Sequence, residues 1–269
     1  MTLPDTLKIE LKPRVSLEMV LIPEGRFRIG TRGYSDDEQP LCEVVLSDFY
    51  LGVFPVTQSQ FAVWRPKHRN GFSGVGRSRH PAETISWFDA VSYCEWLNST
   101  CLSELPSGYR FCLPSECQWE YACRLSVDQS GQRQILETDY YTGDGVAALD
   151  AAGWHAGNSE SKTHPVGQKA GTSLGLYDLH GNVWEWCRDA WCDDPYFRYD
   201  WGEKNPEVRA ADVGFSELDA HRVVRGGSWL NPSRDCRAAY RYYWDPGIRS
   251  GARGFRVCAC SGPRANQHR

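Results

Sequence analysis

Two helix-start signals in the first half of the chain constrain its fold more than any other feature. Ser86-Trp-Phe-Asp89 has the capping-box layout with Asp in place of Glu, and Ser115-Glu-Cys-Gln118 repeats it. A shorter helix is predicted after the second signal, and after the first the apolar residues share one helical face: Trp87, Ala90, Val91, Cys94 and Leu97. After Arg124 the sequence is rich in Gly, Asp and Trp with few periodic runs, which predicts loops tied together by short strands. Helices followed by irregular β structure predict an α+β fold.

Strand patterns lie before the first of these helices. Residues 19–30 predict two short strands around a Pro-Glu-Gly turn, which is the pattern of a β-hairpin. Residues 42–46 and 49–53 are also strand-like. Thr57 is a suitable N-cap, and it predicts a short helix over residues 58–64.

Composition favours a single large domain. The chain has 269 residues, of which 41% are hydrophobic and 13% aromatic, and this is ample for a core. Nothing in the middle of the sequence resembles a linker. The many large rings predict irregular structure that aromatic side chains hold in place.

Charge and hydropathy exclude several classes of partner. The formal net charge is −4 and no Lys/Arg block occurs, which argues against a protein that binds nucleic acid or a membrane surface. A short acidic loop is expected at residues 35–38. The N-terminal residues lack the apolar segment of a secretory signal, and no stretch approaches the roughly 18 apolar residues of a membrane span. We therefore expect a cytoplasmic protein.

The cysteine pattern disfavours a zinc site. The chain has 11 cysteines, an odd number, and no Cys-x-x-Cys motif. Cys112, Cys117 and Cys123 are spaced wrongly for one helical face, so most thiols are expected to be reduced and buried. Cys258 and Cys260 share one side of a predicted terminal strand, where they touch each other or fill the core. Core filling is the favoured interpretation.

Residues 222–256 have the composition of a recognition surface. Aromatic residues there would supply rigid contact area, and small polar residues would supply adaptable hydrogen bonds. Gly and Pro interrupt the alternation of a plain strand, so most of this stretch is predicted to be loop. The predicted ligand-binding residues are Trp229, Asn231, Ser233, Asp235, Tyr240, Tyr242, Tyr243, Trp244, Asp245, Ile248 and Ser250.

Eight sequence blocks in a fixed order resemble one family. They span residues 19–258 and are MVLIPEGRFRIG, FPVT, HPAETISWFDAVSYCEWLN, YRFCLPSECQWEYACR, THPVG, GLYDLHGNVWEW, RVVRGGSW and GFRV. Together they resemble the formylglycine-generating-enzyme, or sulfatase-modifying-factor, domain. The resemblance implies the C-type-lectin-like fold of that family, a loop-rich α+β domain with two main helices and short strands. The implied boundaries are an N-terminal extension at 1–18, the domain at 19–260 and a disordered tail at 261–269.

The resemblance also bears on copper. Family members that oxidise a substrate cysteine to formylglycine carry two copper-binding cysteines after an Arg-Gly-Gly-Ser motif. In this chain the motif is Arg225-Gly-Gly-Ser228, and Asn231 and Cys236 occupy the positions of the two copper-binding cysteines. Cu(I) prefers soft sulfur ligands, so an amide is a poor substitute. The resemblance therefore implies no copper and no catalytic residue, with Cys236 as the alternative candidate. The motif's glycines are expected to permit close packing.

The stretch after this motif is similar to a ligand-binding group within the family. These are the variable proteins diversified by retroelements, whose changeable positions lie between fixed framework residues. Matches to the framework are Arg237, Ala239, Arg241, Pro246, Arg249 and Gly254-Phe-Arg256. The resemblance implies a ligand-binding face at residues 229–253.

Residues 178–185 resemble the calcium loop of the family. The resemblance implies ligands from the carboxylates of Asp178 and Glu185 and from the carbonyls of Gly181 and Val183. Oxygen ligands alone suit calcium, which would have a structural role. The alternative is a tight turn whose carboxylates accept hydrogen bonds from backbone amides.

The sequence thus predicts a non-catalytic ligand-binding module whose partner is a protein. Two alternatives stay open. One is a metal-dependent oxidoreductase that converts a protein cysteine to formylglycine, using Cys236 with a different second ligand or metal. The other is an accessory domain that acts with a neighbouring kinase or protease. The identity of the ligand and the oligomeric state stay open as well.

Overall fold

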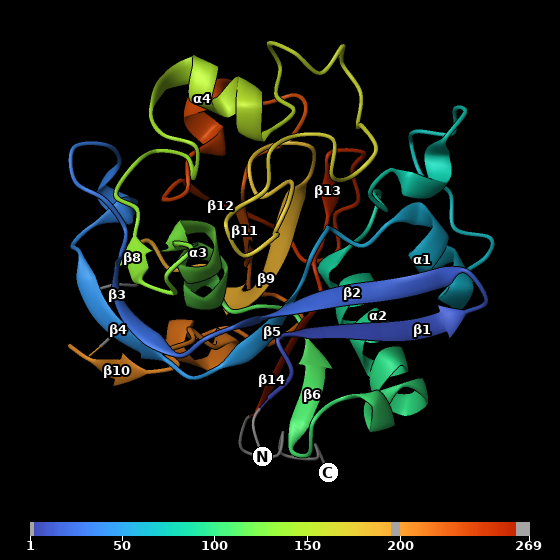
Figure 1. The fold of residues 1–269 in the computed structure, drawn as a ribbon, viewed down its shortest axis with the longest axis horizontal. Coiled ribbons are helices and arrows are strands. Elements are labelled where there is room, and N and C mark those ends of the chain that lie inside the picture. Colours follow the sequence, from blue (N-terminus) through green and yellow to red (C-terminus); the bar gives the residue numbers. More distant parts are fainter. Residues whose placement is uncertain (1–2, 195–199, 262–269) are drawn as a thin grey trace.

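The protein is built from four small sheets that pack around short helices (Figure 1). The computed structural model describes residues 3–194 and 200–261. Helices and strands are joined by long loops, so the predicted loop-rich α+β architecture is confirmed. Within the described residues, no helix is both long and apolar enough to cross a membrane.

The largest sheet has five strands in the order β1-β2-β5-β14-β6, and all neighbours are antiparallel. Its strands are β1 (Thr6–Lys12), β2 (Val15–Ile22), β5 (Phe49–Gly52), β14 (Cys258–Ser261) and β6 (Tyr109–Cys112). Strand β1 lies in the expected N-terminal extension, yet it pairs with β2 and belongs to this sheet. The tail expected after residue 261 lies outside the described residues.

The hairpin predicted for residues 19–30 is wrong. Both strands form, but β2 pairs with β1 and β5, whereas β3 (Gly25–Ile29) pairs with β4 (Cys42–Leu46) in another sheet. Strand β10 (Glu203–Lys204) completes this three-stranded sheet. A two-stranded sheet joins β7 (Leu125–Val127) to β8 (Arg133–Ile135). Strand propensity depends on local sequence, but the choice of partner strand depends on distant segments. The local pattern therefore predicted the two strands correctly and their pairing wrongly.

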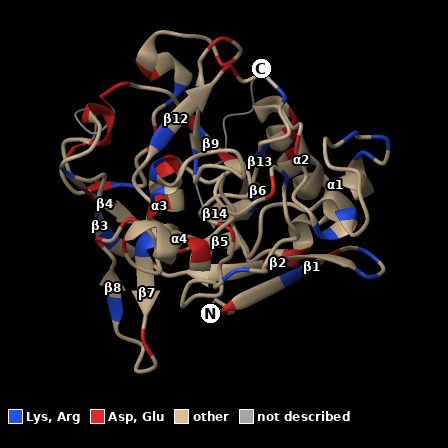
Figure 2. Cartoon of the chain, turned by 90° about the horizontal axis from the view of Figure 1, so that it is seen from above, with Lys and Arg blue, Asp and Glu red and all other residues tan. Residues whose placement is uncertain are grey.

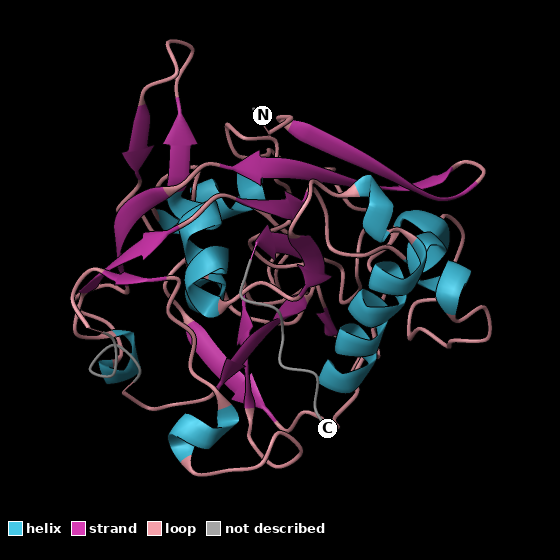
Figure 3. Ribbon diagram, turned by 90° about the horizontal axis from the view of Figure 1, so that it is seen from below, coloured by secondary structure: helices cyan, strands magenta, loops and turns pink. Residues whose placement is uncertain are grey.

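Both main helices begin where the capping boxes predict. Helix α2 (Trp87–Thr100) starts after Ser86, and α3 (Glu116–Arg124) starts after Ser115, each with both reciprocal hydrogen bonds. The predicted short helix is α1 (Gln58–Trp64), which Thr57 caps. Helix α4 (Gly145–Ala152) was not predicted, although its Ala-rich sequence favours helix. Figure 3 shows α2 along one side of the molecule and α3 near its centre.

A four-stranded sheet carries the C-terminal half of the chain. Its order is β12-β11-β9-β13, with β12 (Arg241–Trp244), β11 (Arg222–Arg225), β9 (Trp184–Ala190) and β13 (Arg253–Gly254). The stretch at 222–256 contributes three short strands and one short 3-10 helix, and the rest of it is turn and loop, so the mostly-loop prediction is confirmed. Strand β9 lies outside that stretch and supplies the ladder on which these strands form.

Buried ion pairs join helix α3 to this sheet. Every residue of α3 is buried, including Glu116 and Glu120. Arg225 from β11 donates to both carboxylates, at 2.8 Å and 2.5 Å respectively, and Arg241 from β12 donates to Glu116 at 2.6 Å. These contacts fix β12 against the core. Elsewhere, Lys and Arg residues are spread around the molecule and interspersed with Asp and Glu (Figure 2).

Candidate ligand-binding site

Aromatic side chains from β12 form a half-exposed surface. Tyr242 and Tyr243 are 39% and 37% exposed, and their ring centroids lie 5.6 Å apart. The ring centroid of Tyr243 also lies 4.6 Å from that of Trp191, and the ring centroid of Tyr242 lies 5.3 Å from that of Trp244. Tyr240 extends this row through Trp184, whose ring is within 6.1 Å of it. We call Trp191, Tyr240, Tyr242, Tyr243 and Trp244 the aromatic surface.

A cavity of about 400 Å³ opens beside the aromatic surface. It is lined by Ser35, Asp36, Asp37, Trp191, Asp193, Tyr240, Arg241, Tyr242 and Tyr243. The guanidinium of Arg241 is buried and bound to both oxygens of Glu116, at 2.6 Å and 2.9 Å. Its charge is therefore compensated inside the core, and the carboxylates of Asp36, Asp37 and Asp193 give the cavity an acidic rim.

The acidic loop is held against β12 by two arginines. Arg237 donates two hydrogen bonds to the buried carboxylate of Glu38, at 3.0 Å and 2.7 Å. Arg241 donates to the backbone carbonyl of Asp37 at 2.9 Å. Bidentate Arg–carboxylate contacts fix orientation as well as distance. The loop that supplies the acidic rim thus has a defined position relative to the aromatic surface.

The predicted ligand-binding residues before β12 form hydrogen bonds both within their own segment and with distant ones. The amide of Asn231 donates to Asp235 at 3.1 Å, and the backbone carbonyl of Ser233 accepts from Tyr140 at 2.8 Å. The indole of Trp229 donates to the Gly251 carbonyl at 2.9 Å. Burial raises the pKa of Tyr240 to about 12, and the charge of Asp235 adds to this rise.

The loop after β12 carries the last three predicted residues. Asp245 accepts a hydrogen bond from the Gly247 amide at 2.7 Å, which closes a turn, and Ile248 on this turn is 43% exposed. The carbonyl of Ser250 accepts from the Thr84 amide at 2.9 Å. The structure therefore brings Tyr240, Tyr242 and Tyr243 together around one cavity and distributes the other predicted residues along the chain on either side.

Sequence reasoning missed part of this site. The acidic loop was visible as a charge run, but nothing in the sequence linked it to β12. Trp191 and Asp193 follow β9 directly, and the Trp191 indole donates to Asp193 at 2.8 Å. The sequence pattern that could have indicated them is an aromatic residue, Trp191, followed closely by two acidic residues, Asp193 and Asp194, after a strand.

The residues at the two copper places do not fit a copper site. Cys236 is fully buried, and burial raises the pKa of its thiol to about 12, with a further contribution from Asp235. Such a thiol stays protonated at neutral pH and is a poor nucleophile. The Asn231 amide is already bound to Ser228 and Asp235. One buried thiol and one occupied amide do not form the soft donor pair that Cu(I) needs.

The glycines of the Arg225–Ser228 motif permit close packing, as predicted. Gly227 has φ of 72°, and a Cβ there would lie 2.6 Å from the sulfur of Cys236. A Cβ on Gly226 would lie 2.8 Å from the Leu179 carbonyl oxygen. Only glycine fits at these two positions.

Both carboxylates of the expected calcium loop have protein donors. Glu185 accepts from the guanidinium of Arg256 at 2.8 Å and 2.9 Å and from the Trp119 indole at 2.8 Å. Asp178 accepts from the Gly167 amide at 2.8 Å, and burial raises its pKa to about 6. A calcium ion bound by Glu185 would leave Arg256 buried without its partner, so these donors as arranged do not fit the ion.

The contacts favour the tight-turn alternative for residues 178–185. Asp178 and Asn182 both have positive φ, and Gly181 packs so closely that a Cβ would lie 2.1 Å from the Trp154 carbonyl oxygen. Calcium at Asp178, Gly181, Val183 and Glu185 stays a prediction, which a melting-temperature comparison with calcium and with a chelator tests.

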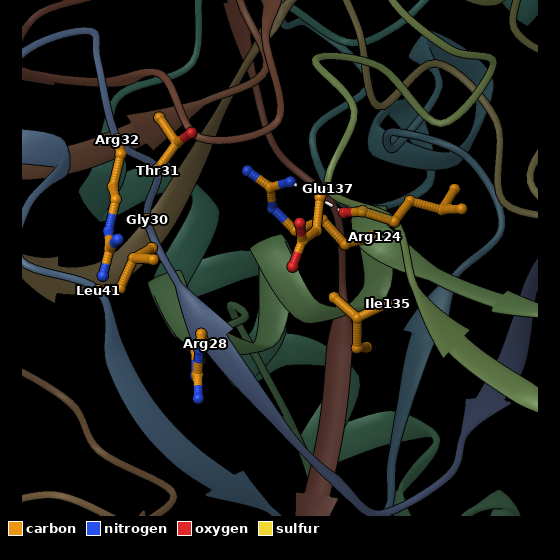
Figure 4. Close-up of a pocket in the computed structure, with 9 residues that line it drawn as sticks. Arg28, Gly30, Thr31, Arg32, Leu41, Arg124, Ile135 and Glu137 are labelled. Atoms are coloured by element: carbon orange, nitrogen blue, oxygen red, sulfur yellow. Dashed lines mark hydrogen bonds between the residues drawn. The ribbon is translucent and has the colours of Figure 1, made fainter.

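A second cavity, of about 530 Å³, lies between β3 and the segment that follows α3. Arg28, Thr31 and Arg32 lie along one wall, and Arg124 and Glu137 lie on the other side (Figure 4). The guanidinium of Arg124 is held by Glu120 at 2.9 Å and by the Leu136 carbonyl at 3.0 Å. The charged groups do not converge on one point, so this cavity is a weaker site candidate than the aromatic one.

Comparison with known proteins identifies the domain type. The family model described as "Sulfatase-modifying factor enzyme 1-like domain" matches residues 8–260. The chain is 30% identical to the serine/threonine-protein kinase pkn1 of Chlamydia caviae over 94% of its own length but only 39% of the kinase. It thus spans well under half of that relative. It is 27% identical to the formylglycine-generating enzyme of Thermomonospora curvata, covering 90% of this chain and 93% of the enzyme.

Solved structures show the same fold. Treponema denticola variable protein 1 matches with a TM-score of 0.77 and 26% identity, covering 96% of this chain and 100% of that one. PvdO from Pseudomonas aeruginosa matches with a TM-score of 0.71 at 24% identity, covering 96% of this chain and 99% of that one.

Proposed function

Because this chain belongs to the sulfatase-modifying factor enzyme 1-like domain family and lacks one of the two copper-place cysteines, we propose that it is a non-catalytic ligand-binding protein. The observation that carries the proposal is the cavity beside the aromatic surface. Its walls include Tyr242 and Tyr243 of β12, a strand that buried ion pairs hold in place, and Trp191, which follows β9. Rigid aromatic anchors on a fixed scaffold are typical of binding surfaces that lose little entropy on association.

The chemistry of the rim favours a protein ligand with a basic side chain. Asp36 and Asp193 are exposed and Asp37 is half-buried, so their carboxylates are available to a partner. Tyr and Trp faces attract guanidinium and ammonium groups. An Arg or Lys side chain of the partner would therefore meet both an aromatic wall and an acidic rim. Likeness to a protein titled a variable protein supports binding, and diversification by a retroelement stays part of the proposal.

Binding of matched peptides tests this proposal. Three peptides of equal length and aromatic content carry Arg, Glu or Ser at the same positions, and fluorescence anisotropy measures their affinity. We expect the Arg peptide to bind tightest. Tyr242→Ala or Tyr243→Ala should weaken it by up to about 30-fold, the loss typical of a hot-spot residue.

The control variant is Phe215→Ala, because Phe215 is 59% exposed and does not line the cavity. Its affinity for the Arg peptide should equal that of the unmodified protein. Equal binding of all three peptides would contradict a cation-selective surface. An equal loss in the Phe215 variant would contradict the location.

The oxidoreductase alternative has its own test. A Cys-x-Pro-x-Arg peptide is incubated with the protein, oxygen, a reductant and Cu(I), and mass spectrometry follows the cysteine. We expect the peptide to stay unchanged, because the thiol of Cys236 is buried and protonated. Conversion that Cys236→Ser abolishes would establish an oxidase instead. The accessory-domain alternative would use the same surface and stays a prediction.

A further inference from the structure

Three cysteines meet on one face of the five-stranded sheet. Strands β6 and β14 are antiparallel, and Cys112 is paired with Cys258. Cys260 lies two residues further along β14, so pleating places its side chain on the same face. The sulfur atoms all lie within 4.8 Å of one another, and those of Cys112 and Cys260 are 3.5 Å apart. Both sequence-based interpretations for Cys258 and Cys260 are confirmed: their sulfur atoms lie close together, Cys258 belongs to the buried core, and Cys260 packs against it.

The surroundings of this thiol cluster combine burial with access. Cys258 is fully buried, whereas Cys112 and Cys260 are half-buried, so two residues of the cluster are partly exposed. Arg188 of β9 places a guanidinium nitrogen 3.9 Å from the sulfur of Cys260. The amide oxygen of Gln118 lies 3.8 Å from the sulfur of Cys258. Across residues 3–194 and 200–261, no histidine, carboxylate or further cysteine joins the cluster.

We propose that Cys112, Cys258 and Cys260 bind a soft metal ion, Cu(I), through three thiolates. Sulfur atoms around a metal ion that is about 2.3 Å from each would lie roughly 4 Å apart, which matches the spacing of the cluster. Thiolate ligands select Cu(I) or Zn²⁺ over hard cations. Zinc completes four coordination, with a fourth protein ligand in structural sites or with water in sites of three protein ligands, whereas Cu(I) is stable with three sulfur ligands alone. The cluster offers three sulfur atoms, so Cu(I) fits better than Zn²⁺.

Binding exchanges protons for the metal and needs no redox step. The three thiols release their protons to solvent, and three Cu–S bonds form while copper stays Cu(I). The resulting site carries two net negative charges. The guanidinium of Arg188 offsets part of this charge from within the protein. The site lies on the five-stranded sheet, whereas β12 with its tyrosines belongs to the four-stranded sheet, so the site does not depend on the proposed ligand-binding function.

Anaerobic titration of the reduced protein tests the proposal. Cu(I) is supplied from a coloured chelator, elemental analysis gives the stoichiometry, and X-ray absorption counts the sulfur neighbours. We expect one copper per chain with three sulfur neighbours. Cys112→Ser and Cys260→Ser should each weaken copper binding by at least about 10-fold. Loss of a residue that only hydrogen-bonds to a metal ligand already costs about that much, so loss of a ligand should cost no less. A parallel titration with Zn²⁺ should give weaker binding.

Two other cysteines serve as controls, and melting temperatures without metal show whether each variant folds. Cys101→Ser changes a buried thiol at the end of α2, and Cys236→Ser changes the thiol at the family's copper place. Both should bind copper like the unmodified protein. Copper retained by a folded Cys112→Ser/Cys260→Ser double variant, copper lost from Cys236→Ser, or tighter binding of zinc would each overturn the proposal.

Discussion

At the scale of single residues, buried arginines determine how the C-terminal segment runs. Arg225, Arg237, Arg241 and Arg256 are all buried, and each has a carboxylate partner from a distant part of the chain. Arg237 and Arg241 stand near tyrosines in a stretch predicted to be a recognition surface, yet both are buried. Arg237 finds Glu38 across 199 positions, and such a partner cannot be inferred from local pattern.

Removing one member of a buried pair should be costly. Arg256→Met leaves the carboxylate of Glu185, which is 1% exposed, without its guanidinium partner. We expect the free energy of unfolding to fall by about 3–5 kcal/mol, as for other broken buried pairs, when denaturant unfolding is measured. Lys8→Met is the control, because Lys8 and its partner Glu18 are mostly exposed, and it should change stability by less than about 1 kcal/mol.

At the scale of elements, the helices were predictable and the strand partners were not. A capping box is a signal within four residues, so Ser86 and Ser115 gave the starts of α2 and α3 from sequence alone. Strand pairing joins distant segments, so the partners of β2 and β3 were predicted wrongly. The same limit hid the acidic loop beside β12 and the thiol cluster between β6 and β14.

The cap of α2 should contribute measurably to stability. The Ser86 hydroxyl accepts from the Asp89 amide at 3.1 Å, and the Asp89 carboxylate accepts from the Ser86 amide at 3.1 Å. Ser86→Ala removes the first bond, and with it the bond that the Ser86 hydroxyl donates to the Asp89 carboxylate at 2.7 Å, and should lower the free energy of unfolding by about 1–2 kcal/mol. Ser99→Ala is the matched control, since Ser99 is exposed near the end of the same helix. Equal effects of the two variants would argue against a capping role.

At the scale of the whole molecule, buried neutral histidines link stability to pH. His180 is fully buried, and its ring contacts the Cys236 carbonyl oxygen at 2.7 Å and the Tyr141 amide at 3.2 Å. Burial lowers its pKa from 6.5 to about 3. As the pH falls, the His180 ring is protonated near pH 6.5 in the unfolded chain but only near pH 3 in the folded protein. The contribution of His180 to stability is therefore present above about pH 6.5 and is lost as the pH falls toward 3.

A variant isolates this contribution. Burial also raises the pKa of Asp178 to about 6 and of Asp189 to about 7, and these groups act in the opposite direction as the pH falls. The informative quantity is therefore the difference between His180→Gln and the unmodified protein. As the pH falls from 6 to 4, the free energy of unfolding should decrease less in the variant than in the unmodified protein. The difference should be up to about 1.4 kcal/mol per pH unit, which corresponds to the uptake of one proton. The exposed His221, changed to Gln, should leave the slope unaltered.

Strand β12 also has an evolutionary consequence. Its attachment to the core depends on Arg241, whose guanidinium donates hydrogen bonds to both carboxylate oxygens of Glu116. The exposed rings of Tyr242 and Tyr243 take no part in that contact. Mutations at those tyrosines would alter what the protein recognises with little penalty to folding, because the anchor stays in place. A saturation library over residues 240–245 should therefore tolerate many substitutions at 242 and 243 and almost none at 241, so that specificity is free to drift while the architecture is retained.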